Sequence, residues 1–148
     1  MTLAAAGLLA LHLLATAAMA GLIWFVQLVH YPLLHLVGPD RFVEYEASHQ
    51  RRTALVVGPL MAVEGVTALA VAAVLRQEVG LILPLVGLVL LAVIHLSTVA
   101  LQVPAHTALS DGYDRSVVRR LVDTNWIRTA GWTLRTLVAA LMVIRAAA

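Results

Sequence analysis

Three histidines lie at the ends of apolar segments or in the polar link between them. His30 closes the first apolar segment, His49 lies in the link that follows, and His106 follows the third. Imidazole is a general acid or base and a common ligand of iron, copper and zinc. Bundles build metal sites from ligands on separate helices. The sequence therefore predicts a transition-metal site at His30, His49 and His106, or, without a cofactor, catalytic bases at His49 and His106.

Glu46 and His49 add an E-x-x-H spacing, which places a carboxylate and an imidazole on one face of a helix. Carboxylate-bridged sites in bundles need two such motifs and further glutamates. The chain has one, so this motif alone does not define a metal site. Each histidine taken singly is also explained as a hydrogen-bonded polar residue.

Other ionisable residues lie inside the apolar segments, where each costs about 2.5–3.5 kcal/mol on insertion scales. Glu64 and Arg135 are expected at similar depth, and we predict that they pair, because either charge alone would be uncompensated. The pair either fixes helix packing or takes part in catalysis and binding. His95 is expected to make an interhelical hydrogen bond, with a proton relay to Glu64 or a haem ligand as alternatives.

Arg128 is expected near the mouth of the bundle, one turn from Trp132. There its guanidinium can hold a carboxylate, a phenolate or a lipid phosphate. The alternative is an arginine that extends to the headgroups without a ligand. The predicted substrate-binding residues are Asn125, Arg128, Trp132, Arg135 and His95, and the predicted catalytic residues are His49, His106 and Glu64.

The elements that must position these residues are membrane helices. The chain is 61% hydrophobic and only 12% charged, whereas soluble domains are about one-quarter charged. Four apolar runs cover approximately residues 4–30, 54–75, 80–102 and 126–145, each long enough to cross a bilayer. We predict an all-α, polytopic membrane protein whose single domain, residues 1–148, is a four-helix transmembrane bundle.

The links between the runs contain breaks and helical patterns. Tyr31-Pro32 and Gly38-Pro39 are expected to interrupt the first helix, after which a helical extension from Arg41 leads into the second span. Gly58-Pro59 should kink that span. A short, separate amphipathic helix is expected over residues 115–122.

Arginines are concentrated in the first and third links. By the positive-inside rule these links, including the helical extension, face the cytoplasm, and both termini face outward. The expected location is a bacterial inner membrane. The arginines of these links are Arg41, Arg51, Arg52, Arg115, Arg119 and Arg120, against Arg76 and Arg145 on the other side.

The absence of cysteine excludes disulfides and thiol redox chemistry. A formal charge of +2 does not indicate nucleic acid as a partner. The expected partners are the lipid bilayer and a lipophilic small molecule, with a homo-oligomer as a further possibility.

Several helix-end features occur together in the chain. They are Tyr31-Pro32, the segment from His49 to Pro59, Pro104, and Asn125 followed by Arg128. In these features, which span roughly residues 24–136, the chain resembles the anthrone-oxygenase-like family of small four-helix membrane proteins. The resemblance implies an oxygenase-like oxidoreductase in which a hydrophobic polyphenol or related aromatic compound reacts with dioxygen inside the bundle.

Two other functions fit the same residues. Glu64, His95 and Arg135 could form a proton-coupled or anion-binding transport path, which with four helices per chain would need a homo-oligomer. Alternatively, the polar stripes only specify packing in a structural membrane subunit.

Overall fold

The computed structural model describes all 148 residues as helices joined by short turns, without a strand. Four of these stretches are long and apolar enough to cross a membrane. The helices are α1 (Leu3–Phe25), α2 (Tyr31–Leu33), α3 (Pro39–Val74), α4 (Arg76–Val79), α5 (Ile82–Ser97), α6 (Val103–Leu109) and α7 (Arg115–Ala147), with π-helical turns at Val26–His30 and Thr98–Gln102 and a 3₁₀ turn at Leu34–Leu36.

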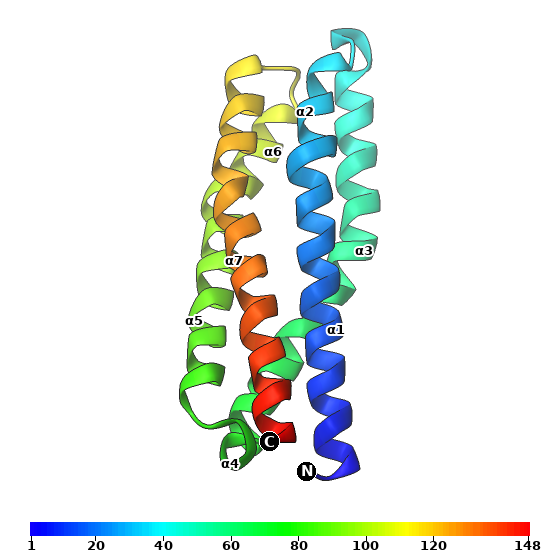
Figure 1. The fold of residues 1–148 in the computed structure, drawn as a ribbon. Helices are drawn as coiled ribbons and strands as arrows, with labels where there is room; N and C mark the ends of the chain where they lie inside the picture. The colour runs from blue at the N-terminus through cyan, green and yellow to red at the C-terminus, as the bar shows by residue number, and fades with distance from the viewer.

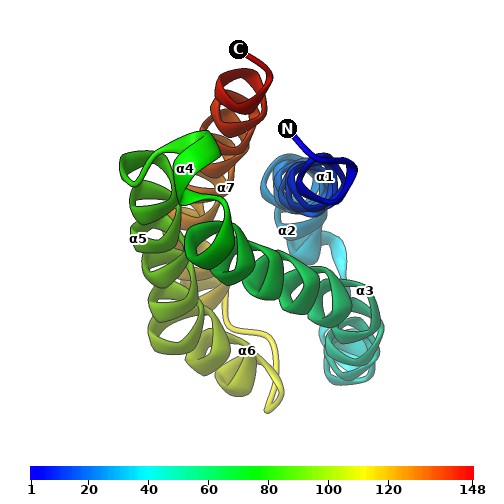
Figure 2. The same cartoon turned by 90° about the horizontal axis from the view of Figure 1, so that it is seen from below.

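The four long stretches form a bundle in which α1 packs against α3 and α7, and α5 packs against α7 and α3. Both termini and α4 lie at one end (Figure 1). The opposite end, here called the loop end, contains α2, α6 and the beginnings of α3 and α7. Seen along the bundle, α3 crosses from the side of α2 toward α4 (Figure 2).

The outside of the bundle is apolar and its inside is partly polar, the reverse of a soluble protein. Leu55, Val66 and Leu96 are 77%, 67% and 69% exposed. Such a surface requires lipid around it. The chain is therefore a multi-pass integral membrane protein, as predicted. The buried polar residues are His12, Thr16, Gln27, Glu46, Glu64, Thr67, Ser97, Gln102, Asn125, Arg128, Thr129 and Arg135.

The predicted helical extension before the second span is present, since α3 begins at Pro39 and continues through the membrane. Pro59 lies inside α3, which bends in its lower half in Figure 1. The separate helix expected over residues 115–122 is wrong. This segment forms the first turns of α7, because Asp114 caps the helix and no breaker follows within it.

Tyr31-Pro32 does not interrupt the first helix as expected. The helix instead widens into a π turn at Val26–His30, in which Tyr31 N donates to Val26 O. The same device precedes Pro104, where Val103 N donates to Thr98 O. Proline lacks an N–H and its ring crowds the carbonyl four residues earlier, and the wider turn accommodates both effects.

Gly131 sets how closely α7 approaches α5. A Cβ atom added at Gly131 would lie 2.7 Å from Ile94 Cγ1, well inside van der Waals contact. Ile94 and Trp132 are both fully buried beside it. The absence of a side chain at Gly131 therefore lets α5 and α7 pack tightly at this level.

Candidate functional site

Three side chains at the loop end form a continuous line of hydrogen bonds. Glu46 Oε1 lies 2.6 Å from His106 Nδ1, and His106 Nε2 lies 3.1 Å from the Tyr31 hydroxyl oxygen. An ionised carboxylate only accepts, so Nδ1 carries the imidazole proton. Nε2 of the neutral ring then accepts from Tyr31. We call this line the Glu46–His106–Tyr31 relay.

Each member of the relay comes from a different element. Tyr31 follows the first π turn, and His106 lies on α6, just after the second. Glu46, on the helical extension of α3, is fully buried, and Gln50 one turn later donates to its Oε1 at 3.0 Å. Gln50 thus holds the carboxylate in place from its own helix.

His30 and His49 lie next to the relay but outside it. Their rings stack with centroids 4.3 Å apart, and the centroids of His49 and His106 are 5.5 Å apart. His49 Nδ1 shares a hydrogen bond of 3.1 Å with Thr53 Oγ1. The structure therefore brings together the three histidines named from the sequence.

The arrangement of these histidines does not fit a shared metal ion. Both nitrogens of His106 are already hydrogen-bonded, and the stacked rings of His30 and His49 face each other with their planes rather than their lone pairs. No group of three or more His, Asp or Glu side chains has the geometry of a metal site. A metal at His30, His49 and His106 stays a prediction without support from this geometry.

A cavity of about 310 Å³ adjoins the relay between α3, α6 and α7, and we call it the inner cavity. Arg128 is 8% exposed, and its Nε is buried without a hydrogen-bond partner. Its guanidinium carbon lies 5.3 Å from the centroid of the Trp132 ring. Among the residues that line the cavity are Tyr31, His49, Gln50, Gln102, His106 and Arg128.

Arg128 thus differs from the other buried arginine, because no carboxylate lies within salt-bridge distance of it. A buried guanidinium without a counter-charge is costly. An anionic or strongly polarised ligand oxygen in the inner cavity would supply the missing partner.

Glu64 and Arg135 form the predicted ion pair deeper in the bundle. Arg135 Nε donates to Glu64 Oε1 at 2.7 Å, and Trp132 Nε1 donates to Glu64 Oε2 at 2.9 Å. Arg135 Nη1 also donates to the Gly87 carbonyl. Three helices meet at this pair, and neither Glu64 nor Arg135 lines the inner cavity.

Two further predicted binding residues also make contacts away from the cavity. Asn125 Nδ2 donates to Gln27 Oε1 at 2.8 Å, which ties α7 to the π turn of α1. His95, half-buried, shares a bond of 2.9 Å with Leu91 O on its own helix rather than with another helix. Of the residues predicted to bind substrate, Arg128 is the one that lines the inner cavity.

Two members of the relay, Tyr31 and Glu46, are not among the catalytic and binding residues predicted from the sequence. The sequence pattern marks Tyr31 only as part of a helix break with Pro32, and Glu46 only by its spacing from His49. The signal for Tyr31 was its position directly before a proline at a helix end. Which imidazole Glu46 contacts depends on the rotation of α6, which the sequence pattern does not specify.

No protein-family model, curated protein or solved structure matches the chain. The fold and the site define its class directly as a four-helix integral membrane protein with a buried polar cluster at one end.

Proposed function

We propose that the protein is a membrane-embedded, oxygenase-like oxidoreductase that acts on a lipophilic aromatic compound in the inner cavity. The observation that carries this proposal is the Glu46–His106–Tyr31 relay, whose phenol and imidazole line that cavity. A carboxylate that orients an imidazole is the arrangement of a general base. The resemblance to the anthrone-oxygenase-like family suggests the same substrate class.

The relay supplies a route for a proton. Tyr31 presents its hydroxyl oxygen to a substrate in the cavity, and a proton taken up there passes through the hydroxyl to His106 Nε2. Glu46 stabilises the imidazolium that forms. Gln50 keeps Glu46 oriented through the bond of 3.0 Å.

Arg128 holds the oxygen on which negative charge develops. Deprotonating a phenol, or a carbon next to an aromatic ketone, places charge on an oxygen. A guanidinium already oriented in a cavity of low polarity stabilises that charge. Because Arg128 is buried and no carboxylate lies within salt-bridge distance of it, its charge is not already neutralised by the protein.

The reaction balances with dioxygen as the only co-reactant. For a CH2 group between aromatic rings, the relay removes one proton, and the carbanion adds to dioxygen with formation of a C–O bond. The proton returns to give a hydroperoxide. Loss of the second C–H proton and cleavage of the O–O bond then give a carbonyl and water. Every electron lost by the carbon is taken up by dioxygen.

The test is dioxygen uptake by the purified protein in detergent or nanodiscs with anthrone as substrate. The His106→Gln variant should lose about 10²–10⁴-fold in turnover. His35→Gln is the matched control, because His35 lies at the same end but is exposed and bonded to Tyr113. Equal rates in the wild type and His106→Gln would contradict the proposal.

A chelator separates this chemistry from a metal-dependent one. If the relay acts alone, treatment with EDTA should leave uptake unchanged, with metal content followed by mass spectrometry. Loss of uptake together with loss of about one equivalent of metal would instead support the three-histidine metal site.

A proton or anion path through Glu64, His95 and Arg135 receives less support. Both oxygens of Glu64 accept hydrogen bonds from α7, and His95 bonds to its own helix. These contacts are those of a packing interaction between helices.

A further inference from the structure

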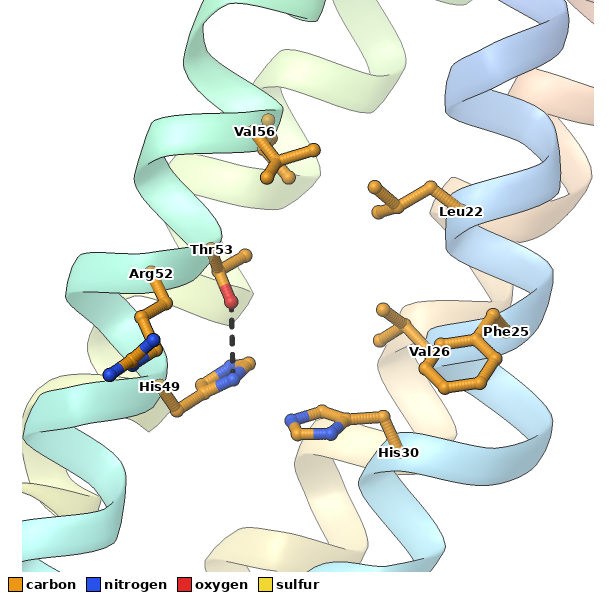
Figure 3. A pocket seen from close by; sticks show the side chains of 9 residues that line it. Leu22, Phe25, Val26, His30, His49, Arg52, Thr53 and Val56 are labelled. Atoms are coloured by element: carbon orange, nitrogen blue, oxygen red, sulfur yellow. Dashed lines mark hydrogen bonds between the residues drawn. The ribbon is translucent and has the colours of Figure 1, made fainter.

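A second cavity lies on the other side of His49, between α1 and α3. It measures about 250 Å³, and we call it the outer groove. Figure 3 shows Leu22, Val26 and His30, on α1 and the turn after it, pointing toward α3, with Phe25 beside them on α1. On α3 the groove is lined by His49, Arg52, Thr53, Val56 and Val57.

The polarity of the outer groove changes along the bundle axis. Leu22 and Val56 line its deeper part, and His30 and His49 line the part nearer the loop end (Figure 3). A third cavity, of about 330 Å³, continues the groove toward the loop end, where Tyr45, Ser48 and Arg52 line it. An apolar channel that ends in a polar rim matches a lipid aligned with the helices.

Arg52 gives the rim a positive charge. Its side chain is exposed and makes no salt bridge, and its one side-chain hydrogen bond is from Nε to Ser48 Oγ at 3.3 Å. The adjacent Arg51 is exposed as well. An arginine at the end of a membrane span binds phosphate through its guanidinium.

The walls of the groove also open to the bilayer. Phe25 and Val56 are 59% and 51% exposed, and both belong to stretches that can span the membrane. Lipid chains are therefore the molecules that meet this surface. In addition, His30 Nε2 is buried beside the groove without a hydrogen-bond partner, so it can bond to a polar group between headgroup and chain.

We propose that the outer groove binds an anionic phospholipid, with its phosphate at Arg52 and one acyl chain against Leu22, Phe25 and Val56. The outer groove adjoins the inner cavity, because His49, Thr53 and Val57 line both, but Arg52 and the apolar side chains of the proposed lipid site line only the groove. Lipid binding in the outer groove does not require the proposed oxidoreductase activity.

The test is native mass spectrometry of the detergent-solubilised protein with added phosphatidylglycerol, and with phosphatidylcholine of the same acyl chains. The wild type should retain phosphatidylglycerol preferentially. Arg52→Gln should weaken this binding about fivefold, the effect of one basic residue near an anionic lipid. Arg51→Gln is the matched control, because Arg51 has the same charge and exposure but does not line the groove.

A second pair of variants tests the acyl-chain part of the groove. Val56→Trp fills the groove and should reduce phosphatidylglycerol binding, whereas Leu55→Trp should not, because Leu55 is 77% exposed and lies outside the groove. Circular dichroism should show the helix content of the wild type in every variant.

Four results would overturn the proposal. Equal binding of phosphatidylglycerol by Arg52→Gln and Arg51→Gln would remove the phosphate contact. Unchanged binding by Val56→Trp would leave only attraction to surface charge. Full competition by inorganic phosphate would indicate an anion site without a lipid, whereas competition by oleate alone would indicate a fatty acid rather than a phospholipid.

Discussion

Arg135 on α7 and Glu64 on α3 form an ion pair 2.7 Å long in which both side chains are at most 1% exposed. This pairing explains why a membrane helix carries an arginine at position 135. The pair joins two helices that are distant in sequence, and Trp132 fixes the second carboxylate oxygen.

Removing one member of this pair should be strongly destabilising. Glu64→Gln or Arg135→Met should each lower the free energy of unfolding by about 3–5 kcal/mol, because the remaining charge stays buried without a partner. Unfolding by SDS in mixed micelles measures the change.

The double variant Glu64→Gln/Arg135→Met tests whether the loss is that of a pair. It should be more stable than either single variant, because no unpaired charge remains. Additive losses in the double variant would mean that the two side chains act independently.

Gly131→Ala should destabilise the contact between α5 and α7 by about 1–3 kcal/mol, because its Cβ would lie 2.7 Å from Ile94 Cγ1. Gly65→Ala is the control, since nothing lies within 4 Å of a Cβ added there. The same unfolding assay compares them. Ile94→Ala removes both Cγ1 and Cδ1, so its loss and that of Gly131→Ala should be less than additive in the double variant if the clash is the cause.

Tyr31→Phe should reduce turnover of anthrone without loss of the fold. The substitution keeps the buried ring and removes the hydroxyl that contacts His106. We expect a decrease of about 10²–10⁴-fold in kcat with little change in KM. Tyr113→Phe, which removes a hydroxyl bonded to His35, should retain the wild-type rate. A Tyr31→Phe variant with wild-type kcat would exclude the phenol from the proton route.

Asp114 should make the start of α7 sensitive to acid. Its carboxylate accepts bonds from the Ser116 hydroxyl and from the Val117 and Ser116 amides, which hold the pKa of Asp114 below its ordinary value. Because the pKa is lower in the folded state, the carboxylate stabilises the fold at every pH above the pKa of an aspartate in the unfolded chain, about 3.9. This stabilisation is lost as the pH falls through the lower pKa of the folded state.

The measurement is the difference in Tm between wild type and Asp114→Ala across pH. The difference should be constant near neutral pH and shrink below about pH 4. Asp111→Ala is the control, because it removes an exposed turn carboxylate that caps no helix, and it should leave Tm close to that of the wild type. If the difference in Tm between wild type and Asp114→Ala persisted below about pH 4, the stabilisation would not come from the ionised carboxylate.

The four helices and the Glu64–Arg135 pair follow from sequence for a simple physical reason. Apolar length fixes which segments cross a bilayer, and two opposite charges buried at one depth must meet. The gathering of His30, His49 and His106 follows in the same way from their positions at or just outside the same ends of the apolar runs.

The relay and the inner cavity depend on how each helix is rotated about its axis. Apolar length and the depth of charged residues do not determine that rotation. His106 faces Glu46 and Tyr31 because α6 follows a π turn. Asn125 donates a hydrogen bond to Gln27, which lies in the other π turn. Tertiary packing selects these rotations. Periodicity within one helix carries no information about them.

The two π turns also give the loop end a tolerance for changes in chain length. Each contains about one more residue per turn than an α-helix would, so deleting a single residue from Val26–His30 should restore an ordinary turn and leave the helix after it facing nearly the same way. A deletion within α7, which has no such turn, would instead rotate one side of that helix against the other by about 100°. Homologues that keep the site should therefore place single-residue gaps at Val26–His30 or Thr98–Gln102 rather than within α7.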